Sequence, residues 1–457
     1  MGAVVASLFV GISTSLAGEI DAKGALDSTL RVGVVDCGQV ADCRFLDFQD
    51  LIVVGGQLDV DVVPDVPVRL DAALRLHPLQ GADTLEDTRF ANQIQFLSVD
   101  LNEAWVGLEE VLGTDIDLRI GQQRFAWGTG LGIQPTDVVN PVDLRDPTRF
   151  DQRLGTPAVS LLWAKGKANL ELVYTPLFRP ARMPVEVNVV DGAAELFDVA
   201  DIGGEGVQIG DFESRTEFPD GRIGFAGVGG RFALATRAID VSVMAYKGYD
   251  SIPQAGGDAR IIGFQTDNDR VDIGVPLLYP ELFVAGGDLR APLPGDVGLW
   301  AEGVAIFPER TAVSASRAQL ENLVRIGTLD AVPDPLPETV VQNGRVYPRT
   351  VVGIDRAFGR VLVSAQWVHG LPTERSAPDV RDYAALGAGV AISDVTRLDL
   401  SAISDFEGVL ATADLSVLHR DAATLSLGTT VIAAASGTAL GDLRALTHVR
   451  GGVSVVF

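Results

Sequence analysis

Residues 446–457 read LTHVRGGVSVVF, and their pattern decides the fold. The odd-numbered positions from 449 to 457 carry apolar side chains or glycine, and the even-numbered positions from 448 to 454 carry polar side chains or glycine. Successive side chains of a β-strand point to opposite faces, so this segment predicts a strand that meets a different solvent on each side. A last edge strand of a soluble β protein is the alternative, although a chain terminus is more often frayed and polar.

The same alternation recurs along the chain, for example over residues 68–75, 115–120, 239–245 and 397–402. Polar faces that carry this many charges cannot form a dry core. In lipid every backbone polar group must be paired, so strands of this kind can span a membrane only as a closed barrel with a wet interior. The predicted lumen-wall residues are Asp71, Asp117, Arg119, Arg124, Asp240, Arg397 and Asp399.

One stretch competes with this interpretation. Residues 422–441 are uncharged and long enough to span a bilayer as a helix. However, Leu425, Leu427 and Val431 alternate with hydroxyl residues and glycine, and this period of two favours a strand.

The connections between the predicted strands alternate between tight turns and long loops. This is typical of outer-membrane barrels, which have short periplasmic turns and long extracellular loops. Counting back from Phe457, which is expected to carry the C-terminal assembly signal, gives about 18 strands, with 16 as the alternative. Residues 98–108 change phase near Asn102 and Glu103, which predicts a β-bulge. We therefore expect an all-β transmembrane antiparallel barrel over residues 18–457.

Residues 1–17 form an apolar run that ends in Ser15-Leu16-Ala17, and this pattern predicts a signal peptide. No Lys or Arg precedes the run, and a buried first strand or helix is the alternative. Only two cysteines exist, Cys37 and Cys43, and we expect a disulfide between them in an oxidising compartment. Zinc binding is less favoured because no His lies nearby.

The charge balance limits the possible partners. The chain has 36 Lys and Arg against 61 Asp and Glu, a net charge of −25, which argues against nucleic-acid binding. Residues 178–220 are especially acidic and could form an anionic vestibule or bind divalent ions that bridge lipopolysaccharide phosphates. A solvated surface is the alternative.

The most individual part of the chain is the long loop 126–155, which is too apolar for a solvated tip and is predicted to fold into the lumen. Its candidate pore-constriction residues are Asp137, Asp143, Asp146, Arg145, Arg149 and Arg153. Opposed carboxylates and guanidinium groups across a constriction create a transverse field that filters solutes by charge and dipole. Alternatively, these charges pair with one another and hold the loop in place.

Residues 98–177 also carry a series of motifs, GQQRFAWG and QPTDVVNPVDL, preceded by LNEAWVGL and followed by LLWAKG. The series resembles an uncharacterised family of proteobacterial outer-membrane barrels, and more loosely the alginate-export barrels. The motif residues are Gly121, Gln123, Trp127, Gly128, Asn140 and Pro141. The resemblance implies a porin-like channel. The acidic balance argues against an alginate-like polyanion as its solute.

We therefore expect a passive outer-membrane channel for small solutes, constricted by residues 126–155. The alternatives are a gated transporter of hydrophobic compounds and a non-conducting scaffold or adhesin. We expect no enzymatic activity, no metal and no cofactor. The expected partners are outer-membrane lipid and lipopolysaccharide, the barrel-assembly machinery through the C-terminal strand, and small solutes.

Overall fold

The computed structural model describes part of the chain. It covers residues 20–456 except 34–45, 62–64, 77–96, 145–148, 183–207, 221–222, 266–269, 326–330, 333, 335, 337, 377, 420–421, 436–437, 439 and 442–446. The predicted signal peptide, the predicted disulfide between Cys37 and Cys43, and Phe457 lie outside the described residues. So do Arg145 and Asp146 of the predicted constriction.

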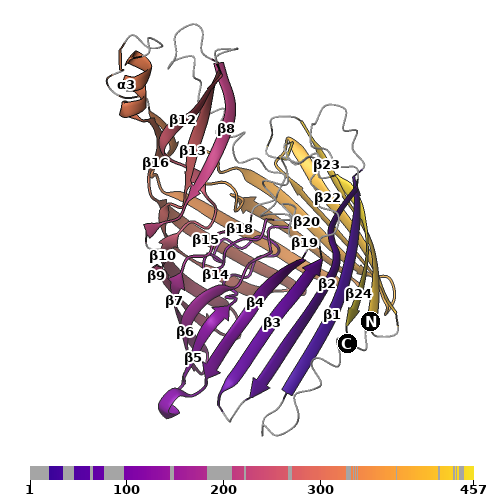
Figure 1. Ribbon diagram of the computed structural model, residues 1–457. Helices are drawn as coiled ribbons and strands as arrows, with labels where there is room; N and C mark the ends of the chain where they lie inside the picture. The colour runs from indigo at the N-terminus through magenta and orange to yellow at the C-terminus, as the bar shows by residue number, and fades with distance from the viewer. Residues whose placement is uncertain are drawn as a thin grey trace.

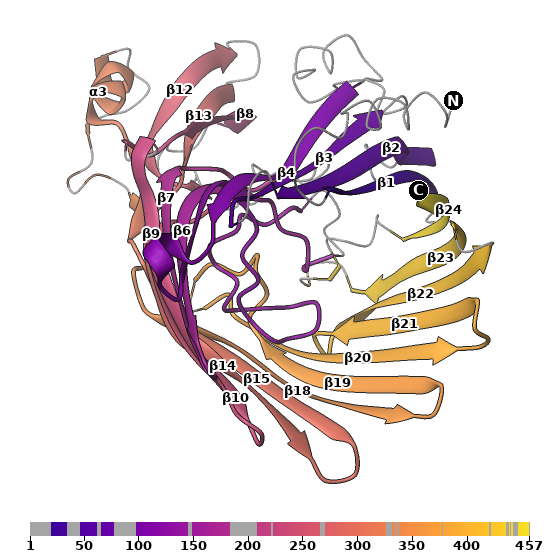
Figure 2. The ribbon, with the colours of Figure 1, turned by 90° about the horizontal axis from the view of Figure 1, so that it is seen from below.

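Eighteen strands form one closed antiparallel barrel (Figures 1 and 2). In ring order they are β1 (Ile20–Gly33), β2 (Leu46–Asp61), β3 (Pro67–Leu76), β4 (Leu97–Leu108), β5 (Ile116–Gln123), β6 (Thr156–Lys165), β7 (Ala168–Leu177), β9 (Ile223–Ala235), β10 (Asp240–Tyr249), β14 (Glu281–Leu293), β15 (Val297–Pro308), β18 (Tyr347–Phe358), β19 (Val361–His369), β20 (Asp382–Ala391), β21 (Thr396–Ser404), β22 (Gly408–His419), β23 (Ala423–Ala434) and β24 (His448–Val456). The ring closes where β24 pairs with β1, from Ala25 opposite Val456 to Gly33 opposite His448. The predicted count of 18 is confirmed.

The two faces of the wall have the predicted two-solvent character. On β10, Ser242, Met244 and Tyr246 are buried toward the lumen, whereas Val243 between them is 59% exposed on the outside. On β23, Leu427 is likewise 59% exposed on the outside, whereas Ile432 is buried on the inside. The period of two in the sequence therefore separates an apolar exterior from an inner face that carries polar side chains such as Ser242 together with buried apolar side chains such as Met244 and Ile432.

The predicted β-bulge lies in β4. The pairing of β3 with β4 passes from Asp71 opposite Glu103 to Ala72 opposite Leu101, so Asn102 is the extra residue. From the neighbouring strand β5, the Gln122 amide donates hydrogen bonds to the backbone carbonyls of Leu101 and Asn102. The phase change in the sequence therefore has a local cause.

Tight turns join the strands at one end of the barrel, and long connections join most of them at the other, as predicted. The turn at residues 405–407, between β21 and β22, is a short connection at the long-loop end. One short turn contains the 3₁₀ helix η1 (Val111–Gly113). At the long-loop end, three connections form a second sheet that rises beyond the barrel (Figure 1). It contains β8 (Gln208–Glu217), β11 (Gln254–Ala255), β12 (Gly257–Gln265), β13 (Arg270–Leu278), β16 (Thr311–Ala315) and β17 (Glu338–Gln342), with helix α3 (Arg317–Arg325) beside it. The sequence predicts loops over these segments, so the second sheet is an addition to the predicted architecture.

No helix among the described residues is both long and apolar enough to cross a membrane.

Candidate functional site

Residues 124–144 and 149–155, here called the lumen segment, leave β5 and return to β6 inside the ring of strands (Figure 2). Phe125, Trp127 and Val139 pack in a buried cluster with inward-facing residues of β6, β7, β10, β14, β15 and β18. Trp127 is only 1% exposed. The predicted inward fold of this loop is therefore what the structure shows.

The tip of the lumen segment reaches the far wall. Ile133 belongs to a second buried cluster, together with Val368 of β19 and Tyr383 of β20. The Gln366 amide of β19 also donates a 2.9 Å hydrogen bond to the backbone carbonyl of Leu131. In the ring, β5 is fifth and β20 is fourteenth, nine strands away in either direction (14 − 5 = 9; 18 − 9 = 9). The segment thus crosses the lumen.

Two carboxylates of the wall bind residues 127–136 of the segment. Glu171 of β7 accepts a 2.6 Å hydrogen bond from the indole Nε1 of Trp127. Glu302 of β15 accepts hydrogen bonds from the backbone N–H groups of Thr129 and Gly130 and, at 2.8 Å, from the Thr136 hydroxyl. Neither glutamate is among the residues predicted from the sequence, although both occupy inward-facing positions on their strands.

The remaining motif residues shape the ends of the segment. Gly121 has φ +134°, and a Cβ there would lie 2.2 Å from the Ala104 carbonyl oxygen, so only glycine fits. Gln123 receives a 2.7 Å hydrogen bond from Ser160 and donates one of 3.0 Å to the Ala158 carbonyl.

Asn140 and Pro141 close the base of the segment. The Phe125 N–H donates to Asn140 Oδ1 at 3.2 Å, and the Pro141 carbonyl accepts the Leu154 N–H at 2.8 Å. Together with Trp127 and Gly128, which contact the wall carboxylates or lie beside them, the motif residues therefore fix the segment in place.

Among the predicted constriction residues, the structure brings Asp137 and Arg153 together. Their side chains are 5% and 4% exposed, and the carboxylate lies 3.3 Å from Arg153 Nε. Burial raises the pKa of Asp137 to about 6, although the Arg153 charge and a hydrogen bond from Asn140 oppose the shift. This ion pair matches the alternative in which the charges hold the loop.

The other two described constriction residues lie elsewhere. Asp143 is buried, and its N–H donates to the Gln152 carbonyl. Arg149 is exposed and pairs with Asp151 at 3.1 Å. A transverse field across this segment stays a prediction.

Most predicted lumen-wall residues occupy inward-facing register positions. Asp71 accepts a hydrogen bond from Asn102, and the Arg119 guanidinium lies 4.6 Å from the centre of the Trp105 ring. Arg397 and Asp399 pair at 2.8 Å and are 59% and 47% exposed.

Three further predicted wall residues lie at strand ends. The Asp240 carboxylate accepts the Thr236 N–H in the turn before β10, and Asp117 accepts the Glu110 N–H in the turn before β5. Arg124 directly follows β5 and opens the lumen segment, and its N–H donates to Glu103.

Several inward-facing charges were not singled out from the sequence. Arg69 pairs with Asp59 at 2.7 Å, and Arg450 pairs with Asp414 at 2.9 Å. Within the described part of the wall, guanidinium and carboxylate groups thus form pairs, Arg69 with Asp59 on the adjacent strand and Arg450 with Asp414 two strands away. Their inward parity was the signal that could have found them.

Two ion pairs link connections at the long-loop end of the barrel. Arg182, which follows β7, pairs with the buried Asp100 of β4 at 2.6 Å. Arg375, between β19 and β20, pairs with the buried Asp250 at 2.7 Å. These two ion pairs tie connections from distant parts of the ring to one another or to the wall.

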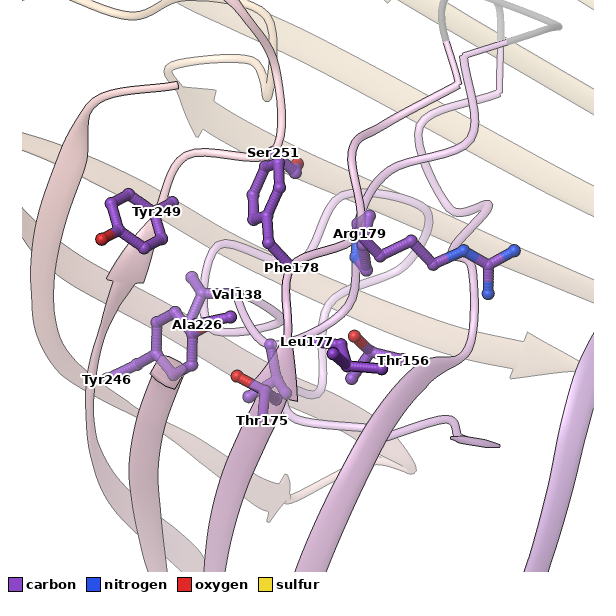
Figure 3. A pocket seen from close by; sticks show the side chains of 12 residues that line it. Val138, Thr156, Thr175, Leu177, Phe178, Arg179, Ala226, Tyr246, Tyr249 and Ser251 are labelled. Carbon is purple, nitrogen blue, oxygen red and sulfur yellow. The ribbon is translucent and has the colours of Figure 1, made fainter. Parts of the chain in front are cut away.

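Figure 3 shows a pocket where the lumen segment meets the wall, lined by Val138 of the segment and by Thr175, Phe178 and Tyr246 of the wall side. Among the described residues, no group of three or more His, Cys, Asp or Glu side chains could hold a metal ion.

No family model matches this chain, and no curated protein sequence matches it. The resemblance of residues 98–177 to a barrel family therefore stays a prediction. The comparison with solved structures does find matches, all of them outer-membrane proteins in the three examples below.

Wzi of Escherichia coli, an outer-membrane protein involved in group 1 capsule assembly and described as a carbohydrate-binding β-barrel, is 10% identical with a TM-score of 0.47; the match covers 100% of this chain and 88% of Wzi. OmpT of Vibrio cholerae is 10% identical with a TM-score of 0.39, covering 98% and 100% of the two chains. OmpF of Salmonella typhi, solved with daunomycin, is 11% identical with a TM-score of 0.40, covering 97% and 99%.

Proposed function

We propose that the protein is a porin-like channel of the bacterial outer membrane, through which small hydrophilic solutes diffuse passively, with the lumen segment as its constriction. One observation carries the proposal: a segment anchored to β7, β15 and β19 crosses a lumen whose wall carries exposed charged side chains. A segment of this kind sets the bore of a barrel.

The membrane location is supported by the wall itself. Large apolar side chains such as Leu386, Leu427 and Val243 are more than half exposed on the outside, and within the described residues each of the 18 strands of the ring pairs with a neighbour on both sides. Hydrocarbon solvates such a surface, whereas water does not. In this proposal the short turns face the periplasm and the long loops the exterior, where lipopolysaccharide is the neighbour. The terminal strand would engage the assembly machinery.

The choice of solute follows from the inner wall. Exposed pairs such as Arg397 with Asp399 are strongly hydrated, which favours hydrophilic solutes over hydrophobic compounds. The excess of 61 acidic over 36 basic residues favours cations over anions. The proposal gives the protein no catalytic role.

Single-channel conductance of the refolded protein in a planar bilayer tests the function. We expect discrete steps with a preference for cations, and larger steps after residues 128–138 are replaced by three glycines. A matched control replaces the exposed residues 294–296 by three glycines. They form the tight turn between β14 and β15, at the short-turn end of the barrel. Silence from both the intact and the shortened protein, when each is folded, would contradict a channel and favour a scaffold.

A further inference from the structure

We propose that Glu302 is the positioning residue that holds the lumen segment across the barrel, so that its carboxylate sets the resting bore. This inference rests on the channel function proposed above. Glu302 is 2% exposed and lies in the middle of β15, far from the segment in sequence. Its contacts supply the argument.

Both carboxylate oxygens of Glu302 bind the segment. Oε1 accepts the N–H groups of Thr129 and Gly130, and Oε2 accepts the hydroxyl of Thr136 at 2.8 Å and its N–H at 3.4 Å. Hydrogen bonds to an ionised carboxylate are about twice as strong as neutral ones. The donors of the segment therefore form a binding site for one carboxylate, and Glu302 of the wall occupies it.

The donors lie on both sides of the tip. Residues 131–135 connect Gly130 to Thr136, and this stretch includes Leu131 and Ile133, which contact the far wall. By binding both ends of the stretch, one carboxylate closes it into a compact turn aimed at β19. Release of Glu302 would free the tip and its far-wall contacts together.

The sequence of the segment is adapted to this carboxylate. Gly128 has φ +114°, and a Cβ there would lie 2.7 Å from both Glu302 Oε2 and Thr136 Oγ1. A Cβ at Gly130 would lie 3.1 Å from Glu302 Oε1 and 2.4 Å from the Ile133 carbonyl oxygen. Side chains at either glycine would displace the carboxylate.

Asp288 provides a matched comparison. It lies directly opposite Glu302 on β14, faces the same lumen and is 6% exposed. Its partners are Arg231, at 3.2 Å, and Ser242, both of which belong to the wall. The two neighbouring carboxylates are both buried, but Glu302 binds the segment, whereas Asp288 binds the wall.

The test compares Glu302→Gln with Asp288→Asn. In Glu302→Gln, the new NH₂ group faces hydrogen-bond donors of the segment in either orientation of the amide, so some of these hydrogen bonds are lost. Asp288→Asn changes a similarly buried carboxylate that does not contact the segment. We expect the glutamine variant to show larger and fluctuating conductance steps, and the asparagine variant to retain wild-type steps. Folding of each variant is verified by its heat-dependent electrophoretic mobility.

A second readout does not depend on conductance. The variant Ile133→Cys, made in a background with Cys37→Ser and Cys43→Ser, places a single thiol at the tip. Ile133 is 5% exposed. In this proposal its side chain becomes accessible when Glu302 no longer binds the segment. We expect Glu302→Gln to speed its labelling by a maleimide about tenfold or more, as loss of a charge-assisted hydrogen bond implies. Asp288→Asn is expected to leave the labelling rate unchanged.

The segment side offers an independent variant pair. Gly128→Ala is expected to reproduce the effects of Glu302→Gln, whereas Gly132→Ala, at φ +79° with nothing within 4 Å of the new Cβ, leaves the carboxylate undisturbed. Unchanged labelling in both Glu302→Gln and Gly128→Ala would overturn the proposal, as would an equal effect of Asp288→Asn. If every variant is silent in bilayers, the channel function fails, and labelling alone still decides whether Glu302 holds the tip.

Discussion

Asp137 is the residue through which pH is expected to act on the lumen segment. Its pKa, near 3.8 in an unfolded chain, rises to about 6 because burial disfavours the carboxylate more than Arg153 and Asn140 favour it. The folded state therefore binds this proton more tightly than the unfolded state does. The resulting stabilisation is fully present below pH 3.8 and is lost as the pH rises through 6.

We therefore predict that the unfolding free energy of the wild type, minus that of Asp137→Asn, falls by up to about 3 kcal/mol between pH 4 and pH 6.5. The loss of the partner of Arg153 in the variant adds an offset that does not vary with pH in this window. Urea unfolding in detergent, followed by tryptophan fluorescence at several pH values, measures the difference. A difference that increases with pH would show that the Arg153 charge outweighs burial.

At the scale of single elements, β4 and β5 show how the wall accommodates a β-bulge. The bulge at Asn102 leaves the Leu101 and Asn102 carbonyls outside the regular ladder, and the Gln122 side chain satisfies both. Gln122 lies on the outward face, where its neighbour Ile120 is 54% exposed. A polar residue on the lipid side thus has a structural task.

We predict that Gln122→Leu lowers the unfolding free energy by about 2 kcal/mol, even though it makes the outer surface more apolar, because two carbonyls lose their partner in hydrocarbon. Ile120→Leu, on the same face of the same strand, is the control and is expected to change stability by less than about 0.5 kcal/mol. Denaturant unfolding in lipid vesicles provides the measurement. Equal stability of the two variants would mean that water reaches the bulge.

The elements also show what local pattern can and cannot predict. The period of two in stretches such as residues 239–245 is a local property, so the number of barrel strands and their faces follow from the sequence. The second sheet does not, because β8 pairs with β13, and β12 with β16, across connections that carry no regular alternation.

The same limit applies to the candidate site. Gly121, Trp127 and Asn140 were identified because their motif lies within one short stretch. Glu302, which binds Thr129, Gly130 and Thr136 of the same segment, lies 166 to 173 residues away from them, and only the closed ring brings it to the segment. Likewise, the sequence identifies the charges of Asp137 and Arg153. Whether the two side chains face each other across an open gap or form an ion pair depends on how the segment packs.

On the scale of the whole molecule, the proposed function places the two faces of the ring in different media, and neighbouring residues of one strand test this separation. Leu427 points outward from β23 and is 59% exposed, whereas Ser426 is exposed on the inward face. In a soluble barrel, an arginine at either position would be solvated. In an outer-membrane barrel, only the inward one would be.

We predict that Leu427→Arg lowers the unfolding free energy by about 2 to 4 kcal/mol in lipid vesicles, because the guanidinium enters hydrocarbon. Ser426→Arg, one residue away, is expected to leave stability nearly unchanged and to shift the reversal potential toward anions, because its charge lies in the lumen. The two variants therefore connect stability to the outer face and selectivity to the inner one. Equal tolerance of both substitutions in lipid would contradict a membrane-spanning wall, whereas an unchanged reversal potential in Ser426→Arg would place the solute path away from β23.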